Sequence, residues 1–241
     1  MKKFIFILLT ISISKSYSQI TFVEYSIRPN IITDTLLSST NKLKHIIDSE
    51  EKIKFALIFD KTKSVYFLQE NQDEENDLNY KLATILNGGS FKYFKNNDMR
   101  TKSYEVELAG QYFNVNLNFN QFNWKITSET KMINGFLCFK AISTYSKIDN
   151  GRNTSVLLEP IAWFYPQIPS SFGPNGIDGL PGLVLEGSLD GSKFFYATKI
   201  ILDYKDTYKL LQKNPKGKSI TEDEFQNINA KIYNEIKENR N

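Results

Sequence analysis

The stretch Tyr104–Asn120, YEVELAGQYFNVNLNFN, decides the class of fold. Apolar residues alternate with glutamate in its first part and with asparagine in its last part, and Ala109–Gln111 supplies a tight turn between them. Because successive side chains of a strand point to opposite faces, this period of two predicts an antiparallel pair with one face on a core. We expect the asparagine face to be solvated; binding of a sugar or a peptide there is the alternative.

The same alternation recurs along most of the chain. Strands are expected at residues 53–59, 65–68, 122–127, 131–133, 136–144, 155–164, 183–188 and 193–204, with a turn at 148–151. Helices are expected at residues 35–47, at 77–86 and at the C-terminus, where Thr221 and Glu224 fit a capping box. Long strands with an aromatic face need a cover. We therefore predict a β-rich α+β fold: a strongly curved antiparallel sheet, half-barrel-like, with a few helices including a C-terminal one. A β-sandwich is the alternative.

The N-terminus has the composition of a secretory signal. Two lysines precede the apolar run Phe4–Ile13, which is too short to span a bilayer, and small residues before Gln19 offer a cleavage site. An uncleaved anchor is the alternative. We expect residues 1–18 to be a signal peptide and residues 19–241 to form a single β-rich domain, since no long linker divides the chain. The mature chain would be exported, periplasmic or extracellular, without a transmembrane segment.

Charge and composition argue against several classes of function. Removing the leader takes away three of the 30 basic residues, which leaves 27 against 27 acidic ones. Phosphate binding needs a sustained basic excess, so we expect no nucleic-acid partner. The single histidine, His45, cannot build a histidine-rich metal centre, and neither a metal nor a cofactor is expected. Cys138 lies in the apolar run FLCF and is expected to be a core residue.

A second stretch, Gly173–Glu186 (GPNGIDGLPGLVLE), predicts a shaped loop that leads into a strand. We call residues 173–182 the Gly/Pro loop; glycine recurs there at every third position, and two prolines fix the backbone. The loop lacks the strand–helix context of a nucleotide site, is too short for a collagen array and does not match an EF-hand. A rigid loop that closes one end of the core and a preorganised recognition loop are both open.

Aromatic residues and prolines alternate just before this loop and predict a stiff apolar surface that loses little entropy on binding. The candidate residues for binding a ligand or a partner are Trp163, Phe164, Tyr165, Phe172, Asp178, Gly179, Leu180, Pro181 and Gly182.

Several motifs between Trp124 and Glu186 resemble those of the GLPGLI family, exported proteins of Bacteroidetes-type bacteria. GLPGLV at Gly179–Val184 is close to the signature that names the family, and WKI, GFLCFKA, AWF, PQIP and GP precede it in the family's order. Two positions depart from the pattern: Tyr165 stands where threonine is expected, and Gln167 where glutamate is usual. If that glutamate were a functional acid, this chain would lack it. The resemblance implies an exported protein and carries over no established activity.

The expected function is a non-catalytic binding or accessory role in the cell envelope, carried by the aromatic–proline strand and the Gly/Pro loop. The partner would be an envelope protein or an apolar ligand such as a lipid. A periplasmic hydrolase is the alternative, because Glu159, Asp178, Glu186 and Asp190 bracket the loop. Two carboxylates that face each other across a cleft can act as general acid and base. We name no catalytic residue.

Overall fold

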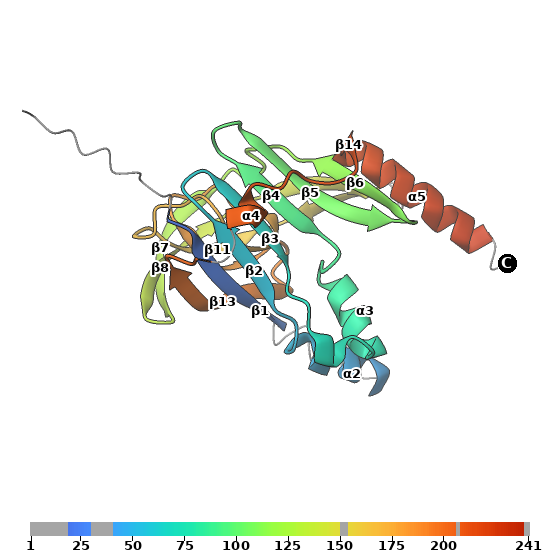
Figure 1. The fold of residues 1–241 in the computed structure, drawn as a ribbon, viewed down its shortest axis with the longest axis horizontal. Coiled ribbons are helices and arrows are strands. Elements are labelled where there is room, and N and C mark those ends of the chain that lie inside the picture. The colour runs from blue at the N-terminus through green and yellow to red at the C-terminus, as the bar shows by residue number, and fades with distance from the viewer. Residues whose placement is uncertain (1–18, 30–40, 150–153, 206–207, 239–241) are drawn as a thin grey trace, which may run out of the picture.

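Twelve strands line up in one open sheet in the computed structural model of the protein, which describes residues 19–29, 41–149, 154–205 and 208–238 (Figure 1). From edge to edge the order is β14 (Lys218–Thr221), β6 (Gln111–Asn116), β5 (Thr101–Leu108), β4 (Lys92–Asn96), β3 (Lys63–Leu68), β2 (Phe55–Phe59), β1 (Thr21–Pro29), β13 (Lys193–Leu202), β12 (Leu183–Ser188), β11 (Ile161–Tyr165), β8 (Phe136–Ile142) and β7 (Lys125–Ile133). Of these neighbours, only β14 and β6 run parallel.

The remaining elements flank this sheet. β9 (Tyr145–Asp149) and β10 (Thr154–Leu158) pair with each other in a second, two-stranded sheet. Two helices, α2 (Asn41–Glu50) and α3 (Leu78–Leu86), pack together beyond one end of the large sheet, and α5 (Glu222–Glu238) extends away from β14 (Figure 1). Short turns of helix are η1 (Gln72–Glu74), η2 (Pro174–Gly176) and α4 (Tyr208–Leu211), of which α4 contacts β3.

The prediction of a β-rich fold with few helices is confirmed, but the expected curvature is wrong. The sheet is mixed and is not strongly curled. It is also not closed, because its edge strands β14 and β7 do not pair. The sheet has no need to curl, because other parts of the chain cover its faces. Segments of the chain, including the Gly/Pro loop and α4, bury the apolar side chains that a half-barrel would bury by curling.

The stretch that decides the class of fold forms β5 and β6, with register Tyr104↔Val115 and a turn in which Ala109 and Gly110 have positive φ. β6 ends at Asn116, however, four residues earlier than the alternation suggests. The main-chain N–H of Leu117 still donates to the carbonyl of Lys102, and the chain then leaves the sheet. This departure places residues 119–124 beside the Gly/Pro loop, where they line a groove.

Helix predictions hold where the structure describes them. Asp77 caps α3, accepting from the N–H groups of Asn79 and Tyr80. At the start of α5 the N–H of Glu224 donates to Thr221 Oγ1 at 3.2 Å, and the N–H of Thr221 donates to Glu224 Oε2 at 2.8 Å, which confirms the capping box. Part of the expected helix 35–47, part of the turn 148–151 and the whole leader 1–18 lie outside the described residues.

Other boundaries differ from expectation for physical reasons. The expected strand 155–164 divides into β10 and β11 at Glu159-Pro160, because proline has no N–H for a ladder hydrogen bond. The expected strands at 122–127 and 131–133 are one strand, β7, whose register against β8 shifts between Ile126 and Thr130. The elements β1, β4, β9, β14 and α4 were not expected.

The largest core cluster joins β1, β2, β3, β8, β12 and β13 and includes the fully buried Cys138, as predicted. Burial raises the pKa of the Cys138 thiol to about 11. The opposite face of β2 and β3 is covered by Leu211 and its neighbours in a separate cluster. For this reason β2 is buried along its whole length although its sequence suggests one wet face.

Candidate functional site

The candidate site is built on the Gly/Pro loop, which is held in one shape by its own backbone. The N–H of Gly179 donates to the carbonyl of Ser171 at 2.9 Å, and the N–H of Val184 donates to that of Phe172 at 3.1 Å. Gly182 lies so close to the preceding strand that a Cβ there would be 2.5 Å from the carbonyl oxygen of Tyr165. Glycine is therefore required by close approach at this position.

Two buried lysines hold the loop through Asp178. The ammonium of Lys95 lies 2.7 Å from Asp178 Oδ1, and that of Lys102 lies 3.1 Å from Oδ2. Lys102 also donates to the carbonyl of Gly176 at 2.8 Å and to Gln121 Oε1 at 2.9 Å, so its three donors have partners. Burial lowers the pKa of Lys102, and the attraction of Asp178 opposes that shift. The loop is thus fixed to β4, to β5 and to the segment after β6.

Beside this anchor lies a groove of about 1020 Å³. One wall is the tip of the Gly/Pro loop, and the facing wall is the segment that follows β6. The start of β7, the end of β8 and residues 159–161, which lead from β10 into β11, complete the groove. The lining residues are Phe119, Asn120, Gln121, Phe122, Asn123, Trp124, Lys125, Ile126, Ile142, Ser143, Thr144, Glu159, Pro160, Ile161, Asp178, Gly179, Leu180 and Pro181.

Trp124 joins the two walls. Its indole Nε1–H donates to the main-chain carbonyl of Asp178 at 2.8 Å, and its ring lies 5.1 Å from that of Phe122. Gly179 and Pro181 are exposed at the rim, whereas Leu180 between them is buried. Ile126 on the edge strand β7 and Ile142 on its neighbour β8 are exposed apolar residues of the groove. The groove therefore has apolar and aromatic side chains on its walls beside polar ones such as Asn120, Asn123 and Glu159, and it is formed before any ligand binds.

The sequence-predicted residues divide between this groove and the core. Asp178, Gly179, Leu180 and Pro181 line the groove, and Gly182 is buried directly behind it. Phe164 and Phe172 are core residues in two different clusters. The half-buried Trp163 lies under the ammonium of Lys131, 4.3 Å from the ring centre, and Tyr165 donates to Gln167 Oε1 at 2.6 Å. Neither Trp163 nor Tyr165 lines the groove.

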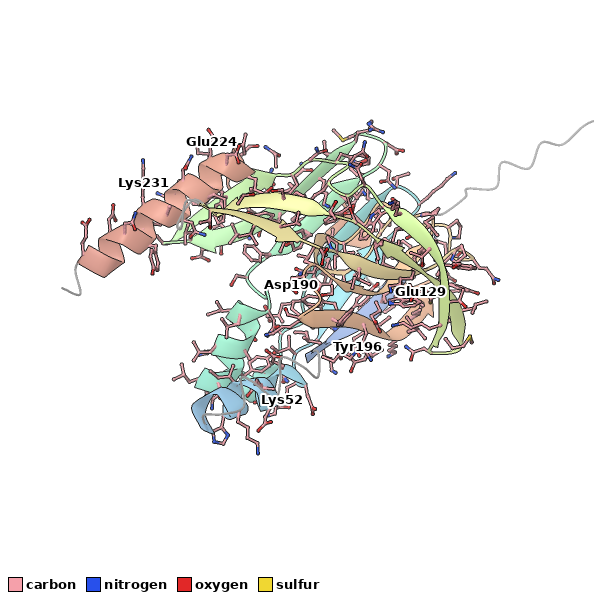
Figure 2. All side chains as sticks on the ribbon, turned by 180° about the vertical axis from the view of Figure 1, so that it is seen from behind. Lys52, Glu129, Asp190, Tyr196, Glu224 and Lys231 are labelled. Carbon is pink, nitrogen blue, oxygen red and sulfur yellow. The ribbon has the colours of Figure 1, made fainter. Side chains whose placement is uncertain are left out.

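The four carboxylates considered for hydrolysis are held by different partners. Asp178 pairs with Lys95 and Lys102, and the buried Glu186 pairs with Arg28 at 2.7 Å and Lys131 at 2.5 Å. Asp190 accepts from Ser192 on the turn before β13 (Figure 2). Glu159 is exposed at the groove. Three of these acids thus have structural partners, and only Asp178 and Glu159 share the groove.

Sequence reasoning missed the residues that face the loop. Lys102 lies on the same face of β5 as Tyr104 and Val106, two and four residues along the strand. Lys95 lies on the same face of β4 as Tyr93. A lysine on the apolar face of an alternating strand indicates a buried acidic partner, and this signal was available. Trp124 was part of the family resemblance, but its contact with the loop could not be derived from spacing.

In the described part of the chain, no three side chains of His, Cys, Asp or Glu gather as metal ligands. None of the helices there combines the length and apolar character that crossing a bilayer requires.

Comparisons with known proteins concern part of the chain and its fold. Residues 146–186 match a family described as "Protein of unknown function (Porph_ging)". The match spans β9, β10, β11 and the whole Gly/Pro loop, and it overlaps the block that resembles the GLPGLI family. No curated protein matches the chain.

Among solved structures, two crystal forms of PNGF-II are similar in fold. The C2 form has a TM-score of 0.55 at 15% identity over 87% of this chain and 32% of the PNGF-II chain. The P21 form gives a TM-score of 0.55 at 15% identity over 88% and 33%. This chain therefore spans about a third of the length of PNGF-II. At this identity the likeness concerns the fold alone.

Proposed function

We propose that the chain is an exported, non-catalytic binding protein of the cell envelope and that the groove beside the Gly/Pro loop is its binding site. The occupant would be an apolar ligand or an apolar segment of an envelope protein. Membership of the GLPGLI family is part of this proposal. The apolar leader with its cleavage site supports export.

One observation carries the binding role: a loop fixed by buried ion pairs forms one wall of a large groove whose other wall is aromatic. Preorganised apolar walls lower the entropic cost of association. The exposed Ile126 and Ile142 extend this apolar surface to the edge of the sheet. The separation of Glu186 and Asp190 from the groove favours binding over carboxylate catalysis.

The test is photocrosslinking in the native cell. A photoreactive residue replaces Asn123, which is exposed at the groove, and a control variant carries it at Lys231 on α5 (Figure 2). We expect a defined adduct, a protein or a lipid identified by mass spectrometry, at position 123 and not at 231. The same adducts at both positions, or none at 123, would exclude the groove as the binding site.

A further inference from the structure

A second cavity, of about 310 Å³, lies on the other side of Phe122 from the groove. It is bounded by β4 and β5, by the start of α5, by Tyr145 and Leu158 of the β9–β10 pair and by Asn175-Gly176 of the Gly/Pro loop. We call it the tyrosine pocket. Its aromatic lining is Phe91, Tyr93, Tyr104, Phe122, Tyr145 and Phe225.

The rings of this pocket support one another, so its walls are formed in advance. Phe91 meets Tyr104 edge to face at 5.0 Å, and Phe225 meets Tyr104 in the same way at 5.9 Å. Tyr145 meets Phe122 at 5.9 Å. Edge-to-face contacts at these distances are favourable beyond their buried area. The buried rings of Tyr104, Phe122 and Phe225 thus support the partly exposed rings of Phe91, Tyr93 and Tyr145, which a ligand could contact with little rearrangement.

The rest of the lining is mixed, with Leu117, Leu158, Gly176 and Leu189 beside five polar side chains. Gln121, Asn175, Glu222, Gln226 and Asn229 contribute four carboxamides and one carboxylate. An apolar ligand would remove water from these groups without replacing their hydrogen bonds, which is costly. The ligand must therefore carry several donors and acceptors as well as apolar faces.

The charges around the pocket favour a ligand without net charge. Glu222 accepts from the Tyr145 hydroxyl at 3.4 Å, and its attraction acts on the buried Lys102. Lys95 and Lys102 pair with Asp178, and these three charges together with that of Glu222 sum to zero, so a charged ligand would add an unbalanced charge to a partly buried site. Burial and the Glu222 carboxylate both raise the pKa of Tyr93 and Tyr104, which keeps these hydroxyls neutral.

We propose that the tyrosine pocket binds a neutral sugar ring. A pyranose combines apolar C–H faces, which stack on aromatic rings, with hydroxyls that can both donate to and accept from carboxamides. This site is separate from the groove assigned to an apolar occupant, although the two share Gln121 and Phe122. The sugar-binding proposal can therefore be tested independently of the proposal for the groove.

The experiment is saturation-transfer NMR on the full chain with D-glucose, D-galactose, D-mannose and N-acetyl-D-glucosamine, each alone, and with choline as a cationic probe. We expect at least one sugar to bind with a dissociation constant of about 1 mM, and choline not to bind. Gln226→Ala should weaken that binding about tenfold. The matched control Asn234→Ala, exposed on α5 outside the pocket, should leave it unchanged.

Both substitutions are on the surface of α5, so unchanged thermal unfolding will establish that the fold is intact. Absence of binding by all four sugars at about 20 mM, well above the expected dissociation constant, overturns the proposal. Binding of choline in preference to the sugars overturns it too. So does sugar binding that Gln226→Ala and Asn234→Ala affect equally.

Discussion

The ammonium of Lys102 lies 3.1 Å from Oδ2 of Asp178, and both side chains are buried. The same ammonium donates to the carbonyl of Gly176 and to Gln121, so it joins β5 to the Gly/Pro loop between the groove and the tyrosine pocket. A buried ion pair contributes little net stability over an apolar substitute, but the loss of one partner is expensive. The pair therefore fixes the position of the loop rather than adding to stability.

The first prediction concerns the anchor. Asp178→Asn would remove the carboxylate that pairs with both buried ammonium groups, so we expect a loss of roughly 3–5 kcal/mol in the free energy of unfolding. Lys95→Met should cost less, because Lys102 still neutralises Asp178. Urea unfolding measures both. The control Asp190→Asn affects an exposed turn only, and an equal loss in Asp178→Asn and Asp190→Asn would contradict the anchor.

The second prediction separates two glycines of the Gly/Pro loop. Gly182→Ala places a Cβ 2.5 Å from the carbonyl of Tyr165, so the backbone must shift, and we expect a loss of about 2–4 kcal/mol. Gly179 has φ +91, and a Cβ there would meet only the Trp124 ring, at an ordinary contact distance of 3.8 Å, so Gly179→Ala should cost only the backbone strain, about 1–2 kcal/mol. Gly191→Ala, also at positive φ and in open space, is the control for strain alone. If Gly182→Ala lowers the free energy of unfolding no more than Gly191→Ala does, the close approach of Gly182 to Tyr165 is contradicted.

Period-two alternation was sufficient to predict most strands, because it reports which face of a strand is buried. It did not lead to β1, β4, β9 or β14, nor to the point where β6 leaves the sheet. Of the two walls of the groove, only the one formed by the Gly/Pro loop was predicted. The loop residues are visible in sequence, but Phe119, Phe122 and Trp124 come to face them only through tertiary packing. For the same reason Phe164 and Phe172, which look alike in sequence, lie in separate core clusters.

The third prediction uses two buried tyrosines whose rings meet edge to face at 6.2 Å. The Tyr25 hydroxyl donates to the carbonyl of Val184 at 2.6 Å, whereas the Tyr66 hydroxyl has no hydrogen-bond partner in the described part of the protein. Tyr25→Phe leaves a buried carbonyl unsatisfied, so we expect a loss of about 1–3 kcal/mol. Tyr66→Phe removes an unsatisfied group and should be neutral or stabilising. Thermal unfolding of the two variants checks the order, and a larger loss in Tyr66→Phe would reverse the assignment.

The fourth prediction concerns the thiol of Cys138. Burial raises its pKa to about 11, above the value of about 8.5 for an exposed thiol. Because the folded pKa is the higher one, the stabilisation is complete below pH 8.5 and is lost as the pH rises toward 11. Cys138→Ala removes this pH dependence and leaves a small cavity of constant cost. The difference in stability between wild type and Cys138→Ala should therefore shrink between pH 8 and pH 11 by up to about 1.4 kcal/mol per pH unit.

Buried tyrosines titrate equally in both proteins and cancel in the difference. Parallel stability curves, or rapid reaction of the folded protein with a thiol reagent at pH 8, would contradict the burial of Cys138.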